Sequence, residues 1–105
     1  MELKDVCALV SFSDEKMQKV SLFDSENYFC DLYCLKPGQE QRIHRHPESD
    51  KIYYVIEGRG LFHIAGDERE CGDGEAVIAR PNEDHGVRNQ GTENLVLLVF
   101  MTPRP

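Results

Sequence analysis

The stretch IHRHPESDKIYYVIEGRG, residues 43–60, contains the pattern that most strongly indicates the fold. His44 and His46 are separated by one residue, and the apolar run that follows Lys51 ends in glycines. Because successive residues of a β-strand point to opposite faces, an H-x-H pair places two imidazoles on the same face. Neighbouring imidazoles are common ligands of divalent metal ions. The stretch therefore predicts a β-strand that carries part of a metal site.

The rest of the chain also has the pattern of a β protein. Short runs rich in Val, Ile, Leu, Tyr and Phe alternate with turns rich in Gly and Pro, a spacing that is typical of a sandwich or barrel. Residues 2–12 favour either a short helix or an added edge strand. The predicted strands are Met17–Phe23, Tyr28–Leu35, Gln41–His46, Ile52–Glu57, Leu61–Ala65, Ala76–Ala79, His85–Asn89 and Leu95–Met101.

Length and composition exclude several classes of protein. With 105 residues the chain is expected to form one domain, and its net charge of -7 argues against a nucleic-acid-binding surface. It has no apolar run long enough to span a membrane and no signal-peptide pattern, so we expect a cytoplasmic protein without a membrane partner. None of the four cysteines forms a C-x-x-C pair, which argues against a structural zinc site.

Strand alternation also selects candidate residues for a pocket. Arg42 has the same parity as His44, and Tyr53 has the same parity as Lys51, so each pair is expected on one face. Arg42 is a candidate for binding a carboxylate, although a solvated arginine is the simpler interpretation. Tyr53 is expected inside the barrel, where its hydroxyl could line the pocket. His63 is a further candidate, against the default of a structural or exposed histidine.

Two spaced motifs give the chain a family resemblance. It resembles the cupins, whose first motif reads G-x5-H-x-H-x(3,4)-E-x6-G and whose second reads G-x5-P-x-G-x2-H-x3-N. Residues 38–58 contain the first motif and residues 74–89 the second, with Arg80 and Asn82 at the second motif's proline and glycine positions. The matching residues are Gly38, His44, His46, Lys51 in the glutamate position, Gly58, Gly74, His85 and Asn89.

The resemblance implies a fold, a metal and its ligands. The fold would be an all-β double-stranded β-helix, a jelly-roll cupin barrel, in a single domain of residues 1–105. The metal would be a divalent ion such as Fe, Mn, Ni or Zn, held by His44, His46 and His85. Lys51 replaces the glutamate that normally completes the ligand set. Asp50 is adjacent, but its parity is opposite to that of Tyr53, which would direct its side chain away from the site.

Three interpretations of Lys51 remain open at this stage. In the first, the three histidines hold the metal alone and Lys51, as a clamp or proton donor, favours an anionic substrate. In the second, the lysine ammonium replaces the metal in a metal-free pocket. In the third, Lys51 extends to the barrel rim and pairs with Glu48 or Asp50.

Two functions therefore remain open. The first is a metal-dependent enzyme that acts on a small anionic molecule by a dioxygenase-, isomerase- or decarboxylase-like reaction, with Lys51 as a catalytic candidate. The second is a non-catalytic module that binds a sugar or small anion, with or without a metal. The run Leu95–Met101 is apolar on both faces, so its outer face needs cover from the N-terminal segment or from a second subunit. We expect a homodimer.

Overall fold

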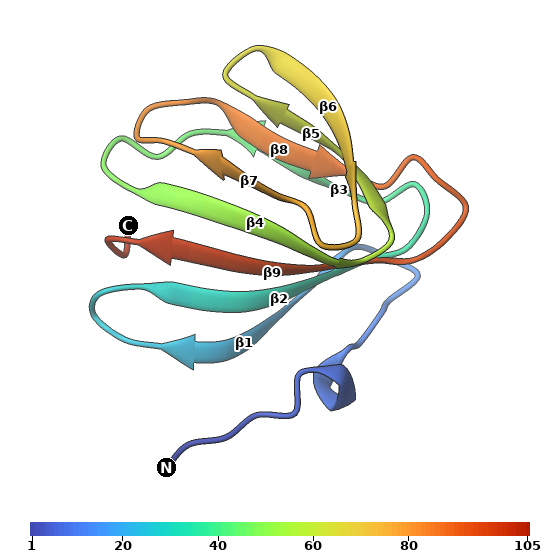
Figure 1. The fold of residues 1–105 in the computed structure, drawn as a ribbon, viewed down its shortest axis with the longest axis horizontal. Helices are drawn as coiled ribbons and strands as arrows, with labels where there is room; N and C mark the ends of the chain where they lie inside the picture. Colours follow the sequence, from blue (N-terminus) through green and yellow to red (C-terminus); the bar gives the residue numbers. More distant parts are fainter.

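The computed structural model describes all 105 residues, and apart from one short 3-10 turn its regular secondary structure consists of antiparallel β-strands in two facing sheets (Figure 1). One sheet has five strands in the order β1-β2-β9-β4-β7, and the other has four in the order β3-β8-β5-β6. The strands are β1 Gln18–Asp24, β2 Phe29–Leu35, β3 Glu40–His44, β4 Asp50–Glu57, β5 Arg59–Ile64, β6 Asp67–Gly72, β7 Ala76–Ala79, β8 His85–Arg88 and β9 Leu95–Thr102. This arrangement confirms the predicted jelly-roll barrel.

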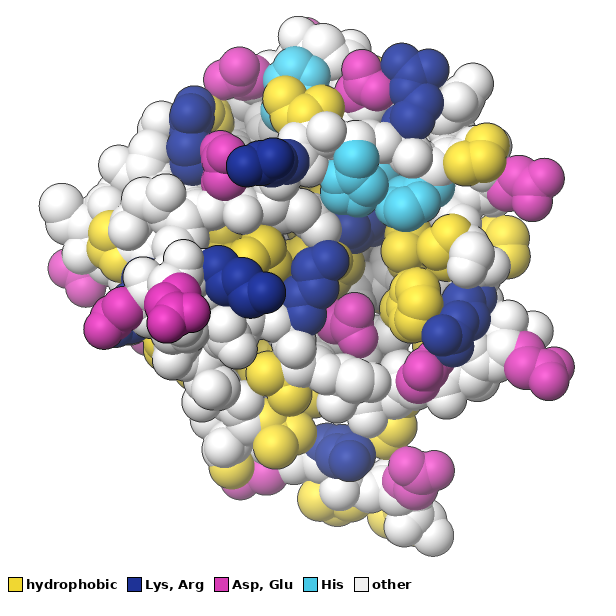
Figure 2. Space-filling view, turned by 180° about the vertical axis from the view of Figure 1, so that it is seen from behind, with side chains coloured by type: hydrophobic (Ala, Val, Ile, Leu, Met, Phe, Trp, Pro, Cys, Tyr) yellow, Lys and Arg dark blue, Asp and Glu magenta, His cyan; other side chains and the backbone are white.

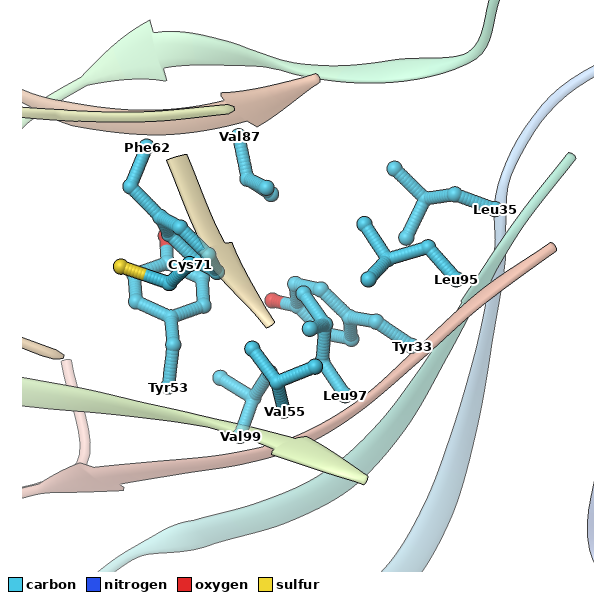
Figure 3. Packing of buried hydrophobic residues seen from close by; sticks show 10 residues of the cluster. All are labelled: Tyr33, Leu35, Tyr53, Val55, Phe62, Cys71, Val87, Leu95, Leu97 and Val99. Atoms are coloured by element: carbon cyan, nitrogen blue, oxygen red, sulfur yellow. The ribbon is translucent and has the colours of Figure 1, made fainter. Parts of the chain in front are cut away.

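The main core fills part of the space between the two sheets. Side chains at alternate positions of β2, β4 and β9 point toward β5, β6 and β8, as alternation requires (Figure 3). Burying this apolar surface is the main favourable contribution to the stability of the barrel. The ten buried core residues are Tyr33, Leu35, Tyr53, Val55, Phe62, Cys71, Val87, Leu95, Leu97 and Val99.

The N-terminal segment covers part of the outer face of the five-stranded sheet. A second cluster around Leu32 and Val96 packs against apolar side chains of residues 6–12 (Figure 1). Only Cys7–Leu9 form a helix, the 3-10 turn η1, and no helix has the length and apolarity needed to cross a membrane. Farther along the sheet, Ile52 and Tyr54 remain 36% and 41% exposed.

The eight predicted strands are confirmed with boundaries that differ by at most two residues, but the sequence pattern does not predict strand β6. Its sequence, DERECG, lacks apolar alternation, and its first four residues are exposed. β6 lies at the edge of its sheet and is held by its pairing with β5, which sets Leu61 opposite Glu70 and His63 opposite Glu68. Because β6 forms through its pairing with β5, its own sequence does not show the pattern of a strand.

A β-bulge in β3 changes which residues of this strand face the barrel interior. Gln41 pairs with Val87 and His44 with His85, so two residues of β3 lie opposite Gly86 alone. A Cβ on Gly86 would lie 2.8 Å from the carbonyl oxygen of Gln41, so the bulge needs a glycine here. The bulge turns both Gln41 and His44 inward although their spacing is odd.

Candidate metal centre

Three histidines from two strands and a loop meet at one end of the barrel. His44 ends β3 and lies opposite His85, the first residue of β8, while His46 follows in the next loop. The ring centroids are 4.9 Å apart for His44 and His46, and 4.4 Å apart for His44 and His85. One ring nitrogen of each residue lies within 4.8 Å of the others. The set that the resemblance implied is thus present as a cluster.

The chain fixes the orientation of two of these rings. His44 Nδ1 lies 2.8 Å from the Arg42 carbonyl oxygen, and His85 Nδ1 lies 2.9 Å from the Glu83 carbonyl oxygen. A carbonyl oxygen only accepts, so each Nδ1 must carry the proton and donate it. The Nε2 lone pairs are therefore free, which is the tautomer that a metal ligand needs.

The loops that carry the histidines are joined across the mouth of the barrel. The Asn82 backbone N–H donates to the His46 carbonyl oxygen at 2.7 Å. Arg45 Nε donates to Asp84 Oδ1 at 2.8 Å. This ion pair is largely exposed and contributes little free energy, but together with the backbone bond it holds the His46 loop beside the start of β8.

Burial keeps the three imidazoles neutral. Desolvation lowers the pKa values of His44 and His46 below their ordinary value, with Lys51 adding a smaller effect in the same direction. The pKa of His85 falls to about 4, again mainly because of burial. Neutral imidazole is the form that coordinates a metal.

The donor set fits a divalent ion. His85 Nε2 is buried and has no hydrogen-bond partner, although buried polar atoms are nearly always paired. Three neutral nitrogen donors at one end of a barrel match the three protein ligands of many catalytic metal sites, which leave further positions open to water or substrate. Figure 2 shows histidine side chains gathered at the edge of a hollow, with basic and acidic side chains below them.

Lys51 lies inside the barrel and not at its rim. It is 1% exposed, and no ion pair joins it to Glu48 or Asp50, which overturns the interpretation of a rim lysine. Its Nζ lies 5.3 Å from the ring centroid of Tyr33 and 5.2 Å from that of Tyr53. Burial, helped by Lys19, lowers the pKa of Lys51 to about 7.

The sequence pattern does not predict two polar residues near Lys51, Gln41 and Asp31. Gln41 lies between the two tyrosines, with its Nε2 3.0 Å from Tyr33 Oη and its Oε1 2.7 Å from Tyr53 Oη. Asp31 is half-buried, and burial raises the pKa of its carboxyl group while Lys19 and Lys51 oppose that shift. A charged residue inside the apolar run FCDLYCL was the available signal for Asp31. Gln41 gave none, because its inward position depends on the bulge.

The structure separates Arg42 and His63 from the three histidines. Both line a hollow of about 200 Å³ on the outer face of the four-stranded sheet, together with Ile43, Leu61 and Arg88. The bulge overturns the shared parity of Arg42 with His44 and leaves Arg42 exposed. His63 follows the buried Phe62 and so points to the opposite, outer face of the sheet, where its Nδ1 lies 3.8 Å from Glu68 Oε1. Tyr53 does face the interior, where its hydroxyl contacts Gln41.

Comparison with known proteins agrees with this architecture. Residues 31–101 match the sequence profile of the cupin domain. The chain belongs to the cupin family. A crystal structure of a protein from Thermus thermophilus is 42% identical, and each chain covers 100% of the other with a TM-score of 0.97. A cupin from Desulfovibrio desulfuricans is 28% identical, with coverage of 98% and 97% and a TM-score of 0.86.

Curated relatives of this cupin include proteins that are longer. The oxalate-binding protein of Thermotoga maritima is 31% identical over 67 residues, which cover 64% of this chain and 55% of that protein. An uncharacterised protein of Methanocaldococcus jannaschii is 32% identical over 66 residues, which cover 63% of this chain and 53% of that protein. This cupin therefore spans about half the length of these curated relatives.

Proposed function

We propose that this cupin binds a divalent metal ion through His44, His46 and His85 and acts there on a small anionic molecule. The observation that carries the proposal is the buried Nε2 of His85, which has no partner within a cluster of three histidines. An unpaired buried polar atom costs about 1–3 kcal/mol. A bound cation would offset that cost, which explains why such an atom would be retained.

The positive charges beside the histidines favour an anion as the ligand. A divalent ion with three neutral ligands keeps its full charge, and it acts as a Lewis acid toward a coordinated oxygen. Lys51 adds a buried ammonium near the same histidines, whose pKa values it lowers further. The similarity to an oxalate-binding protein supports this ligand class. Dioxygenase-, isomerase- and decarboxylase-like reactions all fit such a centre, with Lys51 binding the anion or donating a proton.

Metal content tests the proposal directly. Untagged wild-type protein is dialysed against Fe, Mn, Ni or Zn ions and analysed by mass spectrometry, and we expect about one tightly held ion per chain. His46→Ala should lose the ion while keeping its circular dichroism spectrum. His63→Ala is the matched control, because His63 is the fourth histidine of the chain and lies on the outer face. Equal metal content in wild type and His46→Ala would refute the assignment.

A second function is favoured by one specific observation, the buried lysine in the glutamate position. Its ammonium opposes a cation in the same space, so the barrel could instead bind a small anion or a sugar without metal and without catalysis. A wild-type protein that holds no metal under any loading condition would support this alternative. In both proposed functions, residues 1–105 form one domain that works in the cytoplasm as a homodimer.

A further inference from the structure

The orientation of the Gln41 amide is fixed by its neighbours. One terminal atom of this amide lies 2.7 Å from Tyr53 Oη and 3.4 Å from Lys51 Nζ. In its ammonium form Lys51 only donates hydrogen bonds, so in that form the atom that faces it is the amide oxygen. The amide nitrogen therefore faces Tyr33 Oη, at 3.0 Å, and donates to it.

This direction of hydrogen bonding assigns different roles to the two tyrosines. Tyr53 Oη donates its proton to Gln41 Oε1, so that proton is used within the protein. Tyr33 Oη accepts from Gln41 Nε2, and no acceptor for its own proton is found in the structure. Burial raises the pKa of Tyr33 to about 12, so the hydroxyl keeps that proton. Tyr33 thus has a free donor, and Tyr53 has none.

Lys51 has free donors in the same region. Its only hydrogen-bond acceptor is Gln41 Oε1, at 3.4 Å, and that oxygen is already bound more closely by Tyr53. The faces of the two tyrosine rings contribute cation–π attraction, but they leave at least two N–H groups without an acceptor. A side chain that is 1% exposed cannot direct those groups to bulk water. Asp31 is the carboxyl group whose charge acts on Lys51, but no ion pair joins the two. An ammonium with unused donors at such a depth is suited to an anionic partner.

The two free donors belong to one wall of the barrel, and the histidines belong to the other. Tyr33 and Lys51 lie on β2 and β4 of the five-stranded sheet, while His44 and His85 lie on β3 and β8 of the four-stranded sheet. Lys19 adds a second ammonium on the Tyr33 side, with its Nζ 5.3 Å from the centroid of that ring. Lys51 and Tyr33 are 1% and 3% exposed, so any ligand that reaches them must be small.

We infer that Lys51 and Tyr33 form a two-donor site for one charged end of a small dicarboxylate, whose other end is directed toward the three histidines. The inference rests on the proposed metal centre only for the end of the ligand that is directed toward the histidines. It makes Tyr33 a specificity-determining residue, because its hydroxyl supplies a donor that a phenylalanine would lack. A monocarboxylate would bind either the donor site or the metal centre, whereas a dicarboxylate would bind both.

Calorimetric titration with malonate and acetate tests this site. Wild-type protein loaded with Zn²⁺, with zinc content measured beforehand, should bind malonate at least about tenfold more tightly than acetate, since a hydrogen bond to a charged group contributes at least about that factor. Tyr33→Phe and Lys51→Met should each weaken malonate binding about tenfold or more while keeping one zinc per chain. Tyr53→Phe removes the same atom as Tyr33→Phe from the same chain of hydrogen bonds, and it should weaken malonate binding less than about threefold.

The outcomes separate this inference from the metal proposal. Malonate affinity that is unchanged in Tyr33→Phe or in Lys51→Met, with zinc present, would overturn the two-donor site and leave the metal centre intact. If the wild type holds no zinc, acetate is titrated into the metal-free protein. Binding that is lost in Lys51→Met would then support the donor site, and equal binding in wild type and variant would overturn it. Tyr33→Phe carries the test if Lys51→Met does not fold.

Discussion

Replacing Lys51 with methionine should stabilise the metal-free protein at neutral pH. The side chain is 1% exposed and has no ion pair, and burial lowers its pKa from 10.5 to about 7. A difference of one pKa unit between folded and unfolded states corresponds to about 1.4 kcal/mol. At pH 7 the unfolded state holds this proton fully and the folded state about half the time. The lysine therefore costs the fold about 4 kcal/mol, out of a total stability that is typically about 5–15 kcal/mol.

The sign of the pH dependence provides a second check. Between about pH 7 and pH 10.5 the unfolded chain binds more protons at Lys51 than the folded chain does, so wild-type stability rises with pH in this window. Methionine has a similar volume and no titrating group, so Lys51→Met lacks this increase. Its advantage in the free energy of unfolding should shrink from about 4 kcal/mol at pH 7 to about 1 kcal/mol at pH 10.

The measurement is urea unfolding of chelator-treated protein, followed by circular dichroism at pH 7 and pH 10. Circular dichroism is suitable because the chain contains no tryptophan for fluorescence. Lys19→Met is the matched control, since Lys19 is an exposed lysine that also approaches the Tyr33 ring, and it should change stability by about 0.5 kcal/mol or less. No gain in Lys51→Met at pH 7, or a gain of equal size at pH 10, would refute the reasoning.

Three further predictions concern the site, the fold and the assembly. Lys51→Glu should tighten zinc binding about tenfold or more in a chelator competition assay, because a carboxylate replaces a like charge; equal or weaker binding would show that position 51 does not reach the ion. Asn89→Ala should lower the free energy of unfolding in urea by about 2–3 kcal/mol, since the buried amide donates to the carbonyl oxygens of Leu35 and Glu93; a loss below about 1 kcal/mol would contradict this. Ile52→Asp should convert the expected homodimer into a monomer in light scattering after size exclusion, and a monomeric wild type would rule out the dimer.

Much of the fold could be predicted because apolar alternation and turn residues act locally. Gly58 illustrates this: it adopts a φ of +96°, and a Cβ there would lie 2.4 Å from the Asn94 carbonyl oxygen, so the position requires glycine and indicates a turn in the sequence. Asn89, a motif residue that directly follows β8, makes three side-chain hydrogen bonds that tie the end of this strand to the neighbouring chain. The three histidines were predicted together because their spacing follows a specific motif.

The remaining part of the site depends on contacts between strands, which a single strand does not encode. Strict alternation predicts Arg42 beside His44, but the β3 bulge exchanges Arg42 for Gln41 on the inner face. That bulge depends on the missing side chain of Gly86 in another strand. The free donor of Tyr33 depends in turn on the direction of the Gln41 amide, which only the position of Lys51 reveals. The role of Tyr33 therefore follows only when the positions of Gly86, Gln41 and Lys51 in the folded structure are known.

The bulge in β3 also makes the charge of the pocket depend on strand length. With regular pairing through the three steps from Gln41 to His44, a guanidinium would enter the barrel in place of a neutral amide. Two positive charges about 4 Å apart repel by about 4 kcal/mol at an effective dielectric constant near 20, so Arg42 beside Lys51 would be strongly disfavoured. Insertions and deletions in this strand, more than substitutions, would therefore change which ligands the barrel accepts. A comparison of natural variants of this protein should align β3 by the number of residues between its inward side chains before their chemistry is compared.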